Sequence, residues 1–439
     1  MEKHSKPVRD GDTVCVVGGG PGGAACAIAL KREAHKLGKD IRVVVMEHKR
    51  FHEYRTYNQC IGVLSPPLED ILKEHLGFGF PDELIFKEIK SYRIRSDLLS
   101  LDLDGLDDGK SYAVSRSKFD AFMLEEARKV GAVIIHNRVT GLEISDEDVL
   151  VYSEGENCKA AAVVGAFGMD EGTGRVFEKA TPYRQPDYLS TIITHIYPGE
   201  EFLKQIGPTI QAFMLSQKGL EFGAVTPKFD HLSINIAGRR VSSKIMLEFL
   251  RSEPVQRFLP PHKRRETPLN YFQGKFPIAP AEGLFGDRYV TIGDAAGLMR
   301  PFKGKGINSA CLTGIYAARS ITNHGVSREA FKNNFYEDCS ELTRDLPYGR
   351  AVRLFTNLCT HFRFMDHLLS IAAEDPVFMN CLFNSVSGHK SYKQIIRETA
   401  SLSLALRLLG EFCKRFILRR PATLPRSAAE AGMVQRPAE

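Results

Sequence analysis

The sequence predicts an α/β fold made of a Rossmann-like domain, an inserted domain built on an antiparallel sheet, and C-terminal helices. Two observations lead to this prediction. Near the N-terminus a glycine-rich turn connects an apolar strand to a helix and a second apolar strand, which is a βαβ pattern. After about residue 180, short segments of alternating polarity replace that pattern. With 439 residues, the chain is long enough for two or three domains.

The composition is that of an ordinary globular protein, with 43% hydrophobic and 26% charged residues. A net charge of +6 permits contact with anionic cofactors or lipid surfaces, and no nucleic-acid partner is expected. The polar N-terminus lacks the apolar region of a secretory signal, and no apolar run reaches the roughly 18 residues of a membrane span. We therefore expect a cytoplasmic protein. No two of the nine cysteines have metal-ligand spacing, so free thiols and no metal site are expected.

The glycine-rich turn follows the first apolar strand, DTVCVV, and opens a helix of small residues. Gly18, Gly20 and Gly23 fit the spacing G-x-G-x-x-G, with Gly22 between the last two. In that spacing the first glycine permits a tight turn, the second lets the backbone approach a pyrophosphate, and the third lets helix and strand pack closely. The N–H groups and the dipole at the helix start favour the phosphate. The turn alone is also compatible with a plain tight turn.

Glu47 lies near the end of the second apolar strand, IRVVVMEHK. A carboxylate at this position accepts hydrogen bonds from both hydroxyls of an adenosine ribose and disfavours a 2′-phosphate. The turn and Glu47 together predict dinucleotide binding, with FAD or NAD(H) favoured over NADP(H).

A second glycine-containing site, GDAAG at residues 293–297, precedes PFKGKGIN and another helix of small residues. This stretch resembles the signature of FAD proteins with the p-hydroxybenzoate hydroxylase-type fold. The resemblance implies that Asp294 bonds the ribityl chain or the pyrophosphate side of FAD. A helix start beside the flavin would stabilise the negative charge of its reduced form. The resemblance also implies that four residues of the PFKGKGIN stretch contact the flavin: Gly304, Gly306, Ile307 and Asn308.

Within that fold the chain is similar to the geranylgeranyl reductase group. Four matches carry the similarity, in the same order and spacing over roughly residues 12–345: GGGPGGAACA, C-x-G-x-L-S from Cys60 to Ser65, VSRSKFDAFMLEEARKVGA, and GDAAG with PFKGKGINSA. The similarity implies that Arg116 contacts FAD; the alternative is a solvated basic residue at a helix start. No dedicated NAD(P)H motif is present, so the external reductant is expected to be a transiently bound NAD(P)H or a ferredoxin.

Cys60 lies in the loop that in the resembled reductases places a cysteine at the flavin. The similarity therefore implies that Cys60 is catalytic, as a proton donor or as a residue that shapes the flavin face. The alternative is a buried structural thiol.

The chain departs from this group at two places. Residues 165–168 read GAFG, where the group has an acidic GADG stretch. The stretch from Phe222 to Pro227, FGAVTP, stands where the group has Y-x-W-x-F-P. Phe222 and Pro227 are expected to bind substrate. The wall of the predicted pocket is thus smaller and partly polar. Because the chain has no Trp, it also lacks the W-x-W-x-I-P segment of flavin-dependent halogenases, and halogenation is not expected.

The last apolar segment, within residues 401–420, also carries several arginines and a lysine. A basic amphipathic helix of this kind either lies on an anionic membrane or docks on the protein itself. The predicted domains are an FAD-binding domain (1–85, 110–180 and 286–345), a substrate and sheet domain (86–109 and 181–285), a helical region (346–420) and a disordered tail (421–439).

The similarity implies an FAD-dependent oxidoreductase that reduces carbon–carbon double bonds of a hydrophobic, isoprenoid-type substrate by hydride transfer. A hydrophobic small molecule or lipid is then the expected partner. Two alternatives stay open: a monooxygenase or dehydrogenase acting on an aromatic or carrier-bound metabolite, and a flavin-binding protein without catalysis.

Overall fold

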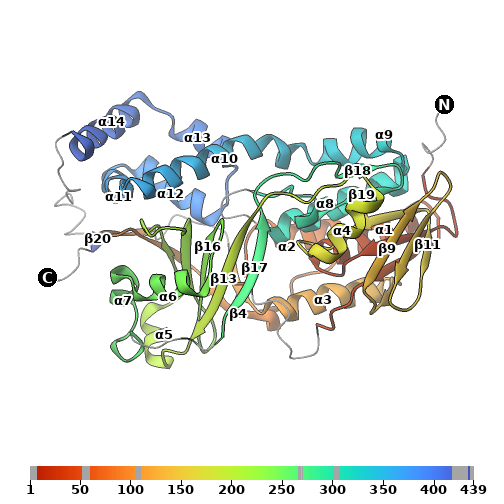
Figure 1. Ribbon diagram of the computed structural model, residues 1–439, viewed down its shortest axis with the longest axis horizontal. Helices are drawn as coiled ribbons and strands as arrows, with labels where there is room; N and C mark the ends of the chain where they lie inside the picture. The colour runs from red at the N-terminus through yellow and green to blue at the C-terminus, as the bar shows by residue number, and fades with distance from the viewer. Residues whose placement is uncertain are drawn as a thin grey trace.

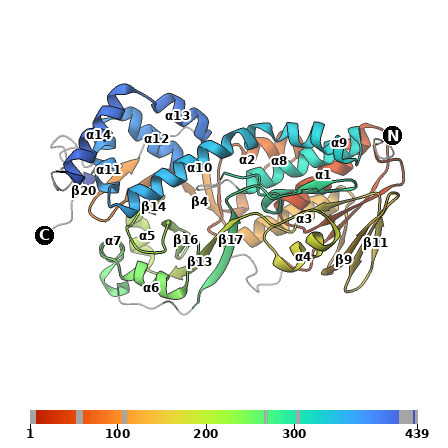
Figure 2. The ribbon, with the colours of Figure 1, turned by 45° about the horizontal axis from the view of Figure 1, so that its top comes forward.

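The computed structural model describes residues 7–51, 60–103, 110–264, 268, 270–300, 306–417 and 434–435. Figure 1 shows two sheet-based bodies beside each other, with the C-terminal helices running along the top. The turned view in Figure 2 again places these helices over the second body. The fold class predicted from the sequence is confirmed.

The first body is built on a sheet with the strand order β18-β19-β12-β1-β2-β8, in which every pair except β18–β19 is parallel. The predicted βαβ unit is confirmed, because β1 and β2 are parallel neighbours joined through α1. The strands and main helices of this sheet are β1 (Thr13–Val17), α1 (Pro21–Lys36), β2 (Arg42–Met46), α3 (Arg116–Lys129), β8 (Val133–Ile135), β12 (Ala162–Gly165), α4 (Glu171–Ala180), β18 (Phe285–Gly286), β19 (Tyr289–Thr291) and α8 (Gly306–Arg319).

Two small antiparallel sheets, β11-β10-β9 and β3-β7-β4, complete the first body. Their strands are β3 (Val63–Leu64), β4 (Ile85–Ile89), β7 (Ser111–Val114), β9 (Val139–Ile144), β10 (Val149–Ser153) and β11 (Cys158–Ala160). The shorter helical segments of the chain are α2 (Leu68–Asp70), η1 (Ile71–Leu76), η2 (Asp82–Leu84), η3 (Pro261–Lys263), η4 (Gly293–Ala295), η5 (Ser320–His324), α9 (Arg328–Ala330) and η6 (Phe331–Tyr336).

The second body is built on a sheet with the order β17-β13-β16-β15-β14-β5-β6-β20. Its pairs are antiparallel apart from β14 and β5, which run parallel and join residues far apart in the sequence. The elements are β5 (Ser91–Arg95), β6 (Ser100–Leu103), β13 (Tyr188–Ile196), α5 (Glu200–Ile206), β14 (Thr209–Phe213), β15 (Phe222–Pro227), β16 (Leu232–Gly238), α6 (Ser243–Arg251), α7 (Glu253–Phe258), β17 (Phe272–Pro277) and β20 (Val434–Gln435).

The C-terminal helices and α5 to α7 cover opposite faces of this sheet. Along β15 the side chains alternate: Phe222 packs with the C-terminal helices, and Val225 packs with Phe249 of α6. The sheet is thus buried on both sides. The C-terminal helices are α10 (Ser340–His361), α11 (Met365–Glu374), α12 (Pro376–Ser387), α13 (Tyr392–Thr399) and α14 (Leu402–Phe416).

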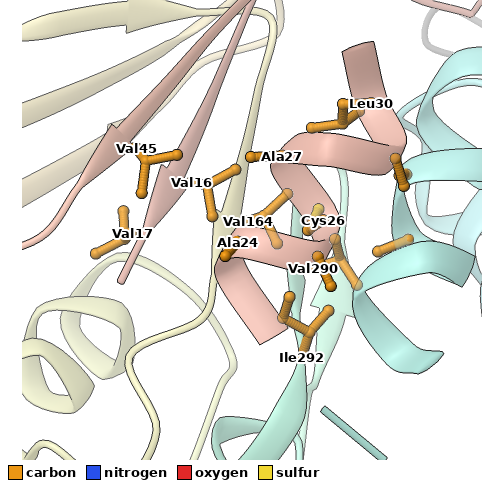
Figure 3. Close-up of a cluster of buried hydrophobic side chains, with 14 of the residues drawn as sticks. Val16, Val17, Ala24, Cys26, Ala27, Leu30, Val45, Val164, Val290 and Ile292 are labelled. Carbon is orange, nitrogen blue, oxygen red and sulfur yellow. The ribbon is translucent and has the colours of Figure 1, made fainter. Parts of the chain in front are cut away.

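The core of the first body forms where α1 packs on the parallel strands. Figure 3 shows Val16, Val45 and Val164 of neighbouring strands together with Ala27 of α1, and all four side chains are fully buried. Strands buried on both faces are continuous apolar runs rather than alternating ones, which is why VCVV and RVVVM form the centre of this sheet.

Helices α1 and α8 approach closely because small residues line their contact. A Cβ placed on Gly314 of α8 would lie 2.5 Å from the carbonyl oxygen of Gly22 in α1. A Cβ on Gly22 would lie 3.1 Å from the carbonyl oxygen of Ala310 in α8. The two glycines therefore set the spacing of the two helices.

Gly314→Ala should destabilise the protein by roughly 1–3 kcal/mol, because the added methyl group meets backbone that has no room to shift. The loss is measured as a lower midpoint of urea unfolding. The control is Gly410→Ala in α14, where an added Cβ meets nothing within 4 Å. An unchanged midpoint for Gly314→Ala would show that the helix contact tolerates a side chain.

Candidate active site

The glycines of the turn between β1 and α1 have two different roles. Some are needed for the turn to form, and one leaves space beside the backbone. Gly18 has a φ of +110°, and a Cβ on it would lie 2.4 Å from the carbonyl oxygen of Ala166. A Cβ on Gly23 would lie 1.9 Å from the carbonyl oxygen of Gly18. These two residues must be glycine for the turn to form. Gly20 differs, because a Cβ on it meets no atom of the protein within 4 Å.

Gly20 is also the N-cap residue of α1, and no side chain caps the start of this helix. The first N–H groups of α1 are therefore not satisfied by a cap, and a helix start of this kind binds phosphate. The open surface at Gly20 and the uncapped helix start fit the pyrophosphate of a dinucleotide. Gly22, in contrast, faces α8 and serves helix packing.

The carboxylate of Glu47 is tied directly to the glycine turn. Glu47 is buried, with 7% of its surface exposed, just after β2. Its Oε2 accepts a hydrogen bond from the backbone N–H of Gly19 at 2.8 Å, and its Oε1 accepts one from the N–H of Lys49 at 2.8 Å. Each carboxylate oxygen keeps a further lone pair, so the carboxylate still fits a ribose hydroxyl.

Asp294 lies in η4, directly after β19, and faces the start of α8. Its Oδ1 is 3.5 Å from the position of a Cβ placed on Gly306, the first residue of α8. Burial raises the pKa of the Asp294 carboxyl, and the charge of Arg116 opposes that rise. The helix start and the carboxylate thus converge where the resemblance places the flavin.

The residues predicted beside Asp294 have different surroundings. Gly304 lies outside the described residues. Ile307 packs against the core of the first body. The side-chain amide of Asn308 donates a hydrogen bond to the carbonyl oxygen of Ser65 at 3.1 Å, so it fastens α8 to the Cys60–Ser65 loop.

Arg116 opens α3 and forms an ion pair with Asp120, at 2.6 Å between Nε and Oδ1. Its side chain is 16% exposed, so it is not the solvated residue of the alternative interpretation. Burial would by itself lower the pKa of Arg116, but the charges of Asp120, Cys60 and Asp294 raise it. Arg116 is therefore a positive charge that Asp120 holds in place at the start of α3.

Cys60 is exposed, whereas Cys15, Cys26 and Cys311 of the first body are buried. A buried structural thiol does not describe it. Two residues later, Gly62 has a φ of +61°, and a Cβ on it would lie 2.5 Å from the carbonyl oxygen of Val114. The backbone N–H of Val114 donates to the carbonyl oxygen of Gly62 at 2.8 Å. The loop that carries Cys60 is thus held against the end of β7, next to Arg116.

Lys228, which the sequence analysis did not assign to the site, reaches the same place from the second body. It follows β15 and is 5% exposed, and its Nζ donates to the carbonyl oxygen of Val114 at 2.7 Å. Burial lowers the pKa of Lys228 to about 8, although the charge of Cys60 opposes the decrease. Its sequence signal is a lysine directly after Pro227, at the end of a buried strand.

The two residues predicted to bind substrate lie in β15. Phe222 is 7% exposed, and its ring centroid is 6.4 Å from that of Phe276. Pro227 ends the strand and is also buried. Between them, Ala224 and Thr226 occupy the positions where the resembled group has Trp and Phe.

No family model matches the chain. The chain is 26% identical over 324 residues to digeranylgeranylglycerophospholipid reductase 1 of Methanopyrus kandleri. The matched region covers 69% of this chain and 78% of that protein. The fold is similar to a flavoprotein/dehydrogenase from Cytophaga hutchinsonii (TM-score 0.66, 18% identity, 92% of this chain and 100% of that one). It is also similar to a geranylgeranyl bacteriochlorophyll reductase-like protein from Thermoplasma acidophilum (TM-score 0.62, 17% identity, 93% and 98% coverage).

The fold and the relatives define the class of the protein. The arrangement of a parallel sheet, an inserted second sheet and C-terminal helices is shared with flavoproteins, and the relatives detected by sequence include reductases. The class predicted from the sequence, an FAD-dependent oxidoreductase, is confirmed.

Gly20→Ala should leave the flavin-free protein as stable as the wild type, because the new methyl group meets no protein atom. The same methyl group would stand where a pyrophosphate approaches, so the affinity for FAD should fall at least about tenfold. Fluorescence titration of flavin-free protein with FAD measures this change. Equal affinity of Gly20→Ala and wild type would show that the pyrophosphate does not lie at this turn.

Proposed function

We propose that this chain binds FAD between the starts of α1 and α8 and reduces carbon–carbon double bonds of a hydrophobic, isoprenoid-type substrate. The observation that carries the proposal is the convergence at one edge of the parallel sheet: Gly20 with its uncapped helix start, Glu47, and Asp294 beside Gly306. Ligands of open α/β sheets bind at the carboxyl ends of the strands, where this convergence occurs. The curated relative named as a digeranylgeranylglycerophospholipid reductase supports the reaction and the substrate class.

In this proposal, different residues of the chain bind different parts of FAD. The N–H groups at the start of α1 hold the pyrophosphate, and Glu47 holds the adenosine ribose. Asp294 bonds the ribityl or pyrophosphate side, and the start of α8 stabilises negative charge on the flavin ring. When bound, FAD supplies the hydride chemistry. An external reductant, NAD(P)H or a ferredoxin, completes the proposal.

The protein supplies the proton. Cys60 is an exposed thiol, and Gly62 of the same loop lies against Val114, to which Lys228 also bonds. A thiol placed within reach of a substrate carbon can donate a proton to it. Cys60 is therefore proposed as the residue that protonates the substrate carbon.

One feature of the second sheet favours a second candidate function. The Oγ1 of Thr226 and the Oδ1 of Asn235 are buried and have no hydrogen-bond partner within the part of the chain that the structure describes. They lie on neighbouring strands. Buried polar atoms without partners are costly, and a polar substrate would satisfy them. This observation supports the alternative of a monooxygenase or dehydrogenase that acts on a metabolite with polar groups.

Anaerobic reduction followed by reoxidation separates these functions. If the chain is a reductase, its reduced flavin should reoxidise with an isoprenoid substrate in the absence of oxygen, as followed by absorbance in a stopped-flow instrument. Cys60→Ser should slow that step by about 10²-fold or more, the usual contribution of a positioned proton donor. Reoxidation that requires oxygen and substrate together would instead support the monooxygenase, and no reoxidation with either would support a binding protein.

We further propose that α14 contacts an anionic membrane, which would bring the enzyme to a lipid substrate. Leu402, Leu406 and Leu409 lie on one side of this helix and are 77%, 59% and 59% exposed. Leu404, on the other side, is buried against the protein at 8%. The apolar stripe thus faces away from the chain.

Positive charges accompany the stripe, which is why the proposed partner is an anionic bilayer. Arg407 and Lys414 of α14 are 49% and 52% exposed at their side chains, and each also pairs with a carboxylate, Asp375 at 3.8 Å and Glu411 at 2.5 Å respectively. The helix itself is anchored by a hydrogen bond of 2.8 Å between His367 and Glu411. Within the described ranges no helix combines the length and apolar character needed to cross a bilayer, so the proposed contact is peripheral.

Replacing both Leu406 and Leu409 with Glu should weaken binding to phosphatidylglycerol vesicles at least about tenfold, because two apolar contacts are lost and two negative charges are gained. Vesicle flotation measures the bound fraction. Phe229→Glu is the matched control, since Phe229 is 79% exposed but lies outside α14. Flotation of the double variant at the wild-type level would contradict the membrane proposal.

A further inference from the structure

We propose that the exposed side of α10 is a second surface that binds an anionic membrane, and that it holds this helix flat on the bilayer. The proposal concerns a different helix from the contact proposed for α14. It rests on the proposed function, because a lipid substrate would be drawn from a bilayer. Figure 1 shows α10 running along the top of the molecule, from the side of α9 to α11.

The exposed side of α10 carries large apolar side chains that the fold does not bury. Leu354 is 62% exposed, and Leu358 and Phe362 are exposed as well. The spacing of four residues places these three side chains on one side of the helix, and the exposed ring of Phe355 lies beside them. Single exposed apolar residues are common on proteins, but a row of them on one helix marks an interaction surface.

The opposite side of α10 packs on the protein. Gly349, Thr356 and Cys359 are buried there. On the same helix Arg353 is paired with a carboxylate of the second body, since its Nη2 lies 2.6 Å from Oε1 of Glu221. The helix is thus held in the fold by one side, and the apolar row on its other side is not part of a core.

The charges that accompany the apolar row are positive. Arg344, Arg350 and His361 of α10 are all exposed. The acidic residues of the helix, Glu341 and Asp345, lie in its first two turns, so the stretch that carries the apolar row has no Asp or Glu. Guanidinium groups match lipid phosphates, and basic residues next to apolar ones favour the surface of an anionic bilayer. A second copy of the chain fits less well, because this stretch offers no carboxylate to the arginines of the copy.

The end of α10 lies next to α14. Phe364 follows Phe362 by two residues, and its ring centroid is 6.3 Å from that of Phe412 in α14. Phe412 is itself exposed. With its 22 residues, α10 is roughly 33 Å long, so contact along its exposed side would fix the tilt of the molecule on the bilayer.

The test is flotation of the whole protein with phosphatidylglycerol vesicles in the absence of substrate. Replacing both Leu354 and Leu358 with Glu should weaken binding at least about tenfold, because apolar contacts are lost and negative charges are gained. Adding these changes to Leu406→Glu and Leu409→Glu of α14 should weaken binding further, since the two helices contact the bilayer separately. Arg350→Gln should weaken it about fivefold, and high salt should remove that difference.

Leu37→Glu is the matched control, because Leu37 and Leu358 are both 47% exposed but Leu37 lies at the end of α1. Wild-type flotation of the α10 double variant, or an equal loss in Leu37→Glu, would overturn the proposal. So would a wild-type dimer that the double variant converts to monomer with flotation unchanged, as measured by light scattering, because the face would then bind a second copy.

Two further measurements keep the outcome clear. The urea midpoint of the double variant should equal that of the wild type, because both replaced side chains are exposed. Arg350→Gln leaves the apolar row intact, so wild-type flotation of this variant at low salt would contradict the proposal even if the double variant unfolds. If the wild type reduces no isoprenoid, the proposed function fails, whereas flotation without substrate still reports on α10.

Discussion

The close contact between α1 and α8 is the constraint on which the candidate site depends. Gly314 of α8 lies against the carbonyl oxygen of Gly22, and Gly22 lies against Ala310. Because only glycines and the methyl group of Ala310 occupy this contact, both helices can start at the same edge of the parallel sheet. Their positive ends then face one region, with Asp294 beside the second helix start. A pair of larger side chains at this contact would separate the two ends and divide one anion-binding region into two.

Two long-range contacts, one from the second body and one from α8 of the first, hold the surroundings of the Cys60 loop in place. Lys228 bonds the Val114 carbonyl from the end of β15, and Asn308 bonds Ser65 at the end of the Cys60 loop. These two bonds place the loop between α8 and the second sheet. The sheet itself is rigid, since apolar cores lie on both of its faces. Residues from distant parts of the sequence thereby fix the surroundings of the loop.

The parts of the site that could be predicted from sequence are those set by local spacing. The roles of Gly18, Gly20 and Gly23 could be predicted from the spacing within one turn of six residues. The role of Glu47 could be predicted from its place at the end of the next strand. The βαβ unit and the sheet of the second body could likewise be predicted from periodicity. In each case neighbouring residues carry the information.

The remainder depends on pairs that are remote in sequence. Lys228 is 114 residues from Val114, and Asn308 is 243 residues from Ser65, so neither bond leaves a local pattern. The parallel pair β5–β14 is another such contact. Thr226 and Asn235 each bury a polar atom that no group in the described part of the chain bonds, and their placement follows from the register of two strands, which the sequence does not specify on its own.

The central claim is that one dinucleotide spans the two helix starts, and calorimetric titration of the flavin-free protein tests it most directly. FAD should bind with a stoichiometry of one and at least about a hundredfold more tightly than FMN, because only FAD has the pyrophosphate and adenosine ribose for Gly20 and Glu47. Equal affinities for FAD and FMN, or no binding of either, would contradict the account.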